Sequence, residues 1–360
     1  MKKVSTMRRG MARRGMAAVV GLDLSDKKGN YAVLSWRGDI LEEGMVAMTG
    51  ASLRKRFGDR CYRVVIEAGT HSPWVSRELQ ALGHEVIVAN PRQLPLIYRN
   101  NRKNDRLDAL NLARLARLDP GLLAPISHRG EEAQAHLALL RSRDQLVAMR
   151  TGLISHVRGS VKSIGERLPK CSAEAFAAKA AGLVPELLRP ALLPILETIA
   201  SLTSQIRGYD KEVERLGKEV YPQTQVLRQV NGVGPLTSLA FVLTLEEPGR
   251  FRTSRAVGPY LGLTPRSRDT GESHPQLHIT KAGDIFLRKL LVQCAHYILG
   301  PFGKDCDLRR WGLRLAGTTS KDQKKRALPA TARKLAVLLH QLWLTGEVYQ
   351  PLREVTKAAA

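Results

Sequence analysis

The chain has 360 residues, which is enough for two or three domains with hydrophobic cores. Its formal net charge of +24 implies a polyanionic partner, with nucleic acid the leading candidate, and a basic ribosomal or membrane-surface protein is the rival. No apolar stretch reaches membrane-spanning length. The four cysteines are scattered without paired metal-ligand spacing, which argues against a zinc site and predicts a reduced, cytoplasmic protein.

Residues 1–15 form a cationic segment without any acid. Its six cations are Lys2, Lys3, Arg8, Arg9, Arg13 and Arg14. We expect a flexible basic arm that lies on phosphates, and a merely solubilising tail is the alternative.

Residues 16–128 have the pattern of a mixed α/β domain. Three strands follow one another, with a hairpin turn at 26–30 between the first two, and further strands then alternate with helices. This order is typical of a ribonuclease-H-like (RuvC-like) fold. The expected strands are residues 17–24, 31–36, 39–47, 63–67 and 85–89, and the expected helices are 52–57, 73–82 and 105–118.

Four acidic residues occupy conspicuous positions in this domain. Asp23 and Glu67 each close a buried apolar strand, whereas Asp105 and Asp108 are three residues apart on one helix face. Acids placed together repel one another unless a cation neutralises them. If all four meet, they can bind two Mg²⁺ ions for phosphoryl transfer. A solvated helix is the alternative for the helical pair, and Asp26, a turn residue, could replace Asp23.

The segment around this helix is basic. Arg102, Lys103 and Arg106 flank the two helical acids. We expect these cations to guide phosphates toward the acids, and we predict that they contact nucleic acid.

Residues 129–220 have a heptad rhythm in place of strand signals. Apolar residues recur every seven positions from Leu140 to Val161, and in steps of four and three from Ile195 to Leu216. The pattern predicts a connector of coiled-coil helices. The two helices could form a hairpin within one chain or pair between chains, and both arrangements remain open.

The last third is predicted to be mainly helical. The segment around Gly232 and Gly234 resembles a helix-hairpin-helix, in which backbone N–H groups approach a phosphate, although a simple glycine-containing turn is the alternative. Lys281 and Arg288 are further candidate nucleic-acid contacts. We expect one domain over residues 221–302 and a basic helical extension over 303–360.

Two separated motif sets carry a family resemblance. Asp23, Glu67 and Lys103-Asn-Asp-Arg-Leu-Asp-Ala109 resemble the catalytic set of insertion-sequence transposases with a RuvC-like DEDD domain, which are similar to Piv-type DNA invertases and include bridge-RNA-guided recombinases. The C-terminal motifs Tyr260-Leu-Gly-Leu-Thr-Pro265 and Thr280-Lys-Ala-Gly-Asp284 also match. The resemblance implies a RuvC-like domain, a coiled-coil connector and a small transposase domain. It further implies Mg²⁺, a dimer or tetramer, a structured noncoding RNA, and DNA (element ends and target) as partners.

One position departs from the family pattern. Members carry Ser-Gly in the loop after the Gly-Leu-Thr-Pro motif, and this serine is taken as the nucleophile, whereas this chain has Thr270 before Gly271. A threonine hydroxyl can attack phosphorus, but its methyl group restricts the approach. Thr270 is the favoured nucleophile, Ser267 and Ser273 are alternatives, and loss of strand transfer is a third possibility. Arg266 and Arg268 in the same loop are suited to neutralising charge on the attacked phosphate.

These observations lead to an expected function and two rivals. We expect a DNA transposase or site-specific recombinase in which carboxylates bind Mg²⁺ and a C-terminal hydroxyl attacks the scissile phosphate. The first rival is a Holliday-junction-resolvase-like endonuclease that uses water as the nucleophile. The second is a non-catalytic nucleic-acid-binding scaffold.

Overall fold

The computed structural model describes residues 16–93, 104–268, 270–273, 275, 277–318 and 320–353. The chain forms two compact units, Met1–Arg129 and Gly130–Ala360. The predicted basic arm, residues 1–15, lies outside the described residues. Within the described part of the chain, no helix is both long and apolar enough to cross a membrane.

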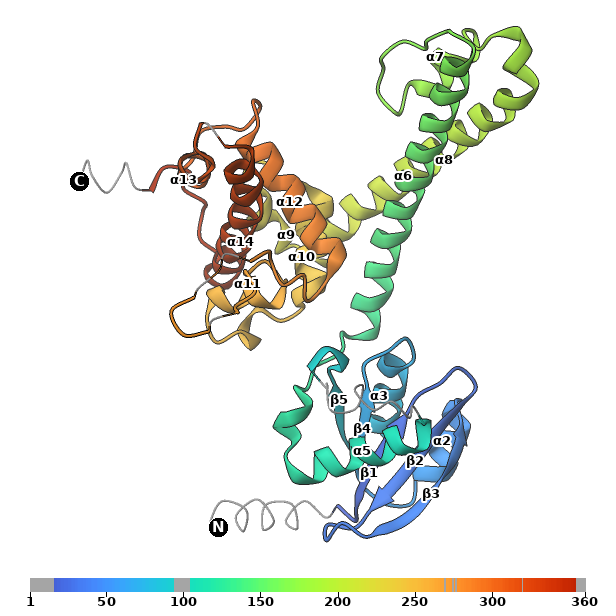
Figure 1. Cartoon of the computed structure of the whole chain (residues 1–360), viewed down its shortest axis with the longest axis vertical. Helices are drawn as coiled ribbons and strands as arrows, with labels where there is room; N and C mark the ends of the chain where they lie inside the picture. The colour runs from blue at the N-terminus through green and yellow to red at the C-terminus, as the bar shows by residue number, and fades with distance from the viewer. Residues whose placement is uncertain are drawn as a thin grey trace. The chain divides into compact units, whose positions relative to one another are not determined.

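The first unit is built on a five-stranded mixed sheet in the order β3-β2-β1-β4-β5 (Figure 1). The first three strands are antiparallel, and β1, β4 and β5 are parallel. The expected mixed sheet is confirmed, and it fits an α/β RuvC-like fold. The strands are β1 (Val19–Asp23), β2 (Lys28–Leu34), β3 (Ile40–Ala47), β4 (Arg63–Glu67) and β5 (Glu85–Ala89).

The second strand begins earlier than the sequence pattern indicated. Asn30 pairs with Asp23, so the chain reverses over residues 24–27, and Lys28 already pairs with β3. A side chain at Gly29 would place its Cβ 2.9 Å from the Asp23 carbonyl oxygen. Because Gly29 has no side chain, β2 can begin at Lys28, within the stretch 26–30 that the sequence pattern had assigned to the turn.

Helices cover both faces of the sheet. Helices α2 (Gly50–Phe57) and α3 (Ser72–Ala81) bury Leu53, Phe57 and Leu79 on the face that carries Val20 and Leu22. Helix α5 (Asp105–Leu118) packs on the opposite face, in a core that includes Val19 and Val65. The two cores follow the strand alternation, in which residues i and i+2 share a face. Short 3₁₀ turns lie at Pro91–Gln93 and Pro120–Leu123.

Two long helices of the second unit run beside each other as a hairpin. They are α6 (Glu131–Ser163) and α8 (Arg189–Arg215), and the segment between them contains α7 (Phe176–Ala181) and a short turn, Glu186–Leu188 (Figure 1). The predicted seam of α8 is buried at Ile199, Leu202 and Ile206. The contact between α6 and α8 lies within one chain, and pairing between chains remains a prediction.

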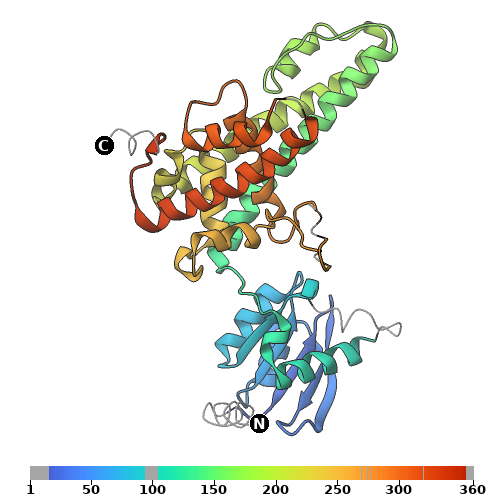
Figure 2. The same ribbon diagram turned by 60° about the vertical axis from the view of Figure 1, so that its left-hand side comes forward.

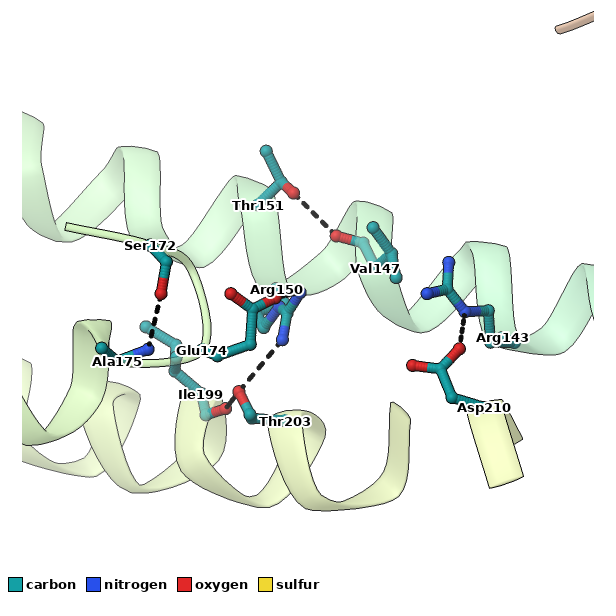
Figure 3. A network of polar contacts seen from close by, with 10 residues as sticks. All are labelled: Arg143, Val147, Arg150, Thr151, Ser172, Glu174, Ala175, Ile199, Thr203 and Asp210. Atoms are coloured by element: carbon teal, nitrogen blue, oxygen red, sulfur yellow. Dashed lines mark hydrogen bonds and ion pairs between the residues drawn. The ribbon is translucent and has the colours of Figure 1, made fainter. Parts of the chain in front are cut away.

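A buried cation joins this hairpin to the segment at its tip. Arg150 is only 5% exposed, and its guanidinium donates to Thr203 Oγ1 at 3.3 Å and to Glu174 Oε1 at 3.1 Å (Figure 3). An ion pair between Arg143 and Asp210, at 2.9 Å, links the same two helices. A buried guanidinium needs these acceptors, so the network favours one register of α6 on α8.

The rest of the second unit is a helical globule around one apolar helix. Thr237 to Leu245 of α10 are all buried, and this core includes Leu137 of α6, Leu287 of α12 and Leu339 of α14. The elements are a π-helical turn (Leu216–Val220), 3₁₀ turns (Pro248–Arg250 and Ser254–Ala256), α9 (Thr224–Arg228), α10 (Pro235–Leu245), α11 (Val257–Tyr260), α12 (Ile285–Leu299), α13 (Asp307–Ala316) and α14 (Lys321–Thr345) (Figure 2).

One core is shared by the two parts into which the sequence pattern divided this stretch, a domain over residues 221–302 and a basic helical extension over 303–360. Leu335 and Leu339 of α14 are fully buried in the core that also holds α10 and α12. The apolar face of α14 needs a partner in order to leave water, and α12 provides it.

Candidate active site

The start of helix α5 is positioned by a cap and by a glycine. Asn104 caps the helix, because its side chain accepts a hydrogen bond from the Arg106 backbone N–H at 3.0 Å. On the neighbouring strand, a Cβ at Gly21 would lie only 1.9 Å from the Ala109 carbonyl oxygen. The backbone of α5 therefore lies directly against β1, an approach that any side chain at Gly21 would obstruct.

This close packing brings three predicted site residues together. Asp23, at the end of β1, meets Asp105 and Asp108, in the first turn of α5, and one ligand atom from each lies within 4.8 Å of the other two. Asp23 and Asp108 are half-buried and Asp105 is exposed. The positive end of the helix dipole favours carboxylates in this turn. Three oxygen donors at this spacing suit a hard divalent cation.

The fourth predicted acid, Glu67, lies at the end of the strand beside Asp23. Strands β1 and β4 are parallel, with Leu22 opposite Ile66, so Asp23 and Glu67 end adjacent strands about 4.8 Å apart. Glu67 shares a sheet face with Val65, which packs in the core under α5. Among the described residues, the group whose oxygens meet comprises the three aspartates without Glu67. Glu67 is therefore a neighbour of this group.

Of the three predicted cations near these acids, Arg106 lies among the described residues. The guanidinium of Arg106 bonds Glu43 of β3, with Nε 3.0 Å from Oε2. This hydrogen bond from Arg106 lowers the pKa of the Glu43 carboxyl. Arg106 is thus engaged within the unit and would have to leave Glu43 to bind a phosphate. Arg102 and Lys103 lie outside the described residues.

The predicted nucleophile lies at the tip of a hairpin in the second unit. Pro265 pairs with Ile279 at its base, and Thr270 pairs with Ser273 at its tip. Backbone N–H···O bonds of 3.3 and 3.0 Å join Thr270 and Ser273 in both directions. Gly271 between them has a φ of +57°, as tight hairpin turns require. Side chains of such a pair project from the same face, so both hydroxyls are presented together and both residues are exposed.

The remaining loop candidates lie along the strands of this hairpin. Ser267 and Arg268 are exposed, as is Arg266, whose backbone N–H donates to the His278 carbonyl at 2.9 Å. The cross-strand bond holds the backbone of Arg266 and leaves its side chain at the surface. The loop therefore offers three exposed hydroxyls and two exposed arginines.

One predicted DNA contact has a structural role. Arg288 is only 8% exposed, and its guanidinium donates to the carbonyl oxygens of Leu261 and Ala282 at 3.0 and 2.7 Å. This cation ties the backbone at Leu261 and Ala282 to α12, since a buried guanidinium needs such acceptors, and a contact between Arg288 and nucleic acid stays a prediction. Lys281 is exposed, and its positive φ of 55° belongs to the close turn beside Gly262.

The two glycines of the predicted phosphate-binding turn differ in their surroundings. A Cβ at Gly232 would lie 2.9 Å from the Tyr297 ring and 3.2 Å from Ile298 Cγ1, and its φ is +93°. Packing against α12 and backbone conformation therefore explain Gly232 without a phosphate. Gly234 precedes α10, and a Cβ there would meet no atom within 4 Å. Phosphate binding at Gly234 stays a prediction.

The sequence pattern did not reveal that α14 borders the loop that carries Thr270. Lys325, Arg326 and Arg333 line the same pocket as Arg266. Arg326 and Arg333 are seven residues apart, about two helical turns, and so lie on one helix face, which was the available signal. The sequence does not show that this helix packs beside the loop, because the two segments are more than 40 residues apart in the chain.

Comparison with known proteins places the chain in a family. Residues 20–165 match the model of the DEDD transposases of the IS110 type, and residues 224–302 match that of the transposase IS116/IS110/IS902 family. A probable family 20 transposase of Pseudomonas aeruginosa is 28% identical over 80% of this chain and 86% of its own length. The transposase for insertion sequence element IS1111A of Coxiella burnetii is also 28% identical, over 80% and 79%.

A third relative is more similar over a shorter stretch. The transposase for insertion sequence element IS1328 of Yersinia enterocolitica is 30% identical over 63% of this chain and 67% of its own length. The matched regions include Asp23, Asp105 and Asp108 in the first unit and the hairpin that carries Thr270 in the second. The chain therefore belongs to the IS110/IS116 family of DEDD transposases.

Proposed function

We propose that this DNA transposase excises and integrates a mobile element with a divalent cation bound by its first unit and a hydroxyl nucleophile from its second. The observation that carries the proposal is the meeting of Asp23, Asp105 and Asp108, whose oxygens lie within 4.8 Å of one another. Three carboxylates held this close repel one another, and a bound cation would offset that repulsion.

The donor set fits magnesium. All three residues offer carboxylate oxygen, the ligand type that Mg²⁺ prefers, and Glu67 on the next strand can contribute a fourth, which would suit a pair of ions. When bound, the cation supplies charge neutralisation at a phosphodiester. The carboxylates themselves would hold it at the end of β1, the central strand of the sheet, where Asp105 is exposed.

The hydroxyl at the hairpin tip would carry out a transesterification. The Thr270 oxygen forms a bond to the scissile phosphorus, and the bond from phosphorus to the 3′ oxygen of the DNA breaks. The threonine proton is released and the departing 3′ oxygen takes up a proton, so the protons balance. The product is a threonyl phosphodiester and a free 3′ hydroxyl, and Arg266 and Arg268 in the same loop would neutralise the attacked phosphate.

A trapping experiment tests this proposal directly. The full-length protein is incubated with supercoiled donor DNA and Mg²⁺, and any DNA-linked peptide is identified by mass spectrometry. We expect the adduct on Thr270. Asp108→Asn should abolish it, whereas Asp59→Asn, an exposed acid in the same unit, should leave it unchanged.

Substitutions in the hairpin separate the candidate nucleophiles. Thr270→Ser should retain the adduct and Thr270→Ala should lose it, because only the first keeps a hydroxyl at that place. An adduct on Ser267 or Ser273 would overturn the assignment to Thr270. Cleavage without any adduct, unaffected by Thr270→Ala, would favour the resolvase-like reaction with water. The structured RNA partner and the dimer or tetramer implied by the family resemblance remain predictions.

A further inference from the structure

A pocket of about 870 Å³ lies in the second unit beside the nucleophile hairpin. One wall is the base of the hairpin and the turn after it, with Pro265, Arg266 and Lys281. The other is the first half of α14, with Lys325, Arg326 and Arg333. Pockets that enclose an organic ligand usually measure about 300–1,000 Å³, so this one can take a group of nucleotide size.

The rim of the pocket is strongly cationic. Five Lys or Arg side chains line it against a single acid, Asp322, which is 77% exposed and 3.6 Å from Lys325. The stem of Arg333 is confined, because a Cβ at Gly258 would lie 3.0 Å from its Cγ. The rim therefore combines a positioned arginine with exposed lysines, an arrangement that attracts a phosphate.

The rest of the lining, which we call the floor, is largely apolar. It is lined by aliphatic side chains, among them Leu263, Ile279, Leu315 and Ala330. Pro329, inside α14, has no N–H, so the carbonyl of Lys325 receives no helical hydrogen bond from position 329. A flat apolar group with hydrogen-bonding edges would match this lining better than phosphate alone.

We infer that the pocket binds an unpaired nucleotide of the DNA strand next to the phosphate that the hairpin attacks. The cations of α14 hold its phosphate, and its base covers the aliphatic floor. A base within a duplex is stacked and paired and cannot reach the floor, so the site selects a single strand. The identity of the strand as DNA rests on the proposed function.

The binding experiment needs neither metal nor chemistry. Full-length protein in EDTA is titrated onto a fluorescent single-stranded DNA oligonucleotide, its duplex, and RNA of the same sequence, at several salt concentrations. Arg333→Gln and the exposed Lys325→Gln remove rim charge, and Ala330→Trp fills the floor without changing charge. Lys211→Gln, an exposed cation of α8, is the matched control, and thermal unfolding verifies that each variant folds.

Each substitution has a distinct expected result. Removing one rim cation should weaken single-strand binding about 3- to 10-fold and reduce the slope of log affinity against log salt by about 0.7. Ala330→Trp should weaken binding of single-stranded DNA at least about fivefold and leave duplex binding nearly unchanged, because only a single strand can place a base against Ala330.

Three results would overturn the inference. The first is that the rim variants bind single-stranded DNA as Lys211→Gln does. The second is that Ala330→Trp weakens duplex binding as much as single-strand binding, and the third is that the substitutions weaken RNA binding but leave DNA binding unchanged. Failure here would leave the trapped DNA adduct intact as evidence for transposition. Conversely, absence of an adduct would not affect the measured strand binding.

Discussion

The contact between Gly21 and α5 predicts that a single methyl group should disrupt the candidate metal site. In Gly21→Ala the new Cβ would lie 1.9 Å from the Ala109 carbonyl oxygen, whereas real Cβ contacts essentially never fall below 3.0 Å. The obstacle is helix backbone and cannot rotate away. The helix start, with Asp105 and Asp108, must therefore withdraw from Asp23 by about 1 Å.

The expected loss of folding stability in Gly21→Ala has two parts. Overpacking of this kind costs about 1–3 kcal/mol of folding stability. Displacement of the two helical acids should also remove cation binding, which at a concentration of about 100 times Kd would add about 2.7 kcal/mol to the stability of the native protein.

Calorimetric titration with Mn²⁺, a Mg²⁺ surrogate, and thermal unfolding with and without the cation measure both parts. The control is Gly69→Ala, since a Cβ at Gly69 meets no atom within 4 Å. Gly21→Ala should lose the cation-dependent rise in Tm, and Gly69→Ala should keep it. If Gly21→Ala bound Mn²⁺ as well as the wild type, the proposed role of this contact would be refuted.

Three further predictions concern the acid group, the helical hairpin and a buried histidine. Glu67→Gln should weaken Mn²⁺ binding about 10-fold and Asp23→Asn by more, since only Asp23 belongs to the three-acid group; equal losses in titration calorimetry would contradict this. Arg150→Ala should lower the free energy of unfolding by about 1–3 kcal/mol, because buried hydrogen bonds are lost, whereas Arg215→Ala, at an exposed position, should change it little. Chemical denaturation measures both variants, and equal denaturation midpoints would argue against a stabilising network. Burial lowers the pKa of His340, so the folded state resists protonation and stability should fall as pH drops below about 6.5, by at most about 1.4 kcal/mol per pH unit. Thermal unfolding from pH 8 to 5 should show a shallower pH dependence in His340→Gln than in the wild type, and an unchanged dependence would exclude this group as a cause.

Local sequence patterns were sufficient to predict most strands and helices of the first unit. The apolar runs that end at Asp23 and Glu67 became buried strands with those ends, because alternation and β-branched residues report burial and extended backbone directly. The helix from Asp105 to Leu118 has its expected bounds, since Asn104 is a strong cap and the apolar period is helical. The second strand shifted because close approach at Gly29, and not the turn pattern, set its start.

The candidate site in the second unit depended more on distant contacts. The sequence singled out Thr270, Ser267 and Ser273 as hydroxyls of one loop. That Thr270 and Ser273 pair across a turn, and so face the same way, follows from the cross-strand hydrogen bonds of the folded hairpin. The burial of Arg288 also depends on the fold, because charge alone does not reveal burial.

The order of residues was enough to identify the acids, the family motifs and the alternation of strands and helices, since each depends on neighbours within a few positions of the chain. Folding in three dimensions decided which of these residues meet. Gly21 admits α5 and so joins Asp23 to Asp105 and Asp108. The apolar face of α14 draws that helix into the common core, and its cations thereby reach the hairpin loop. Both outcomes rest on backbone and side-chain packing between segments far apart in the chain, which no local pattern encodes.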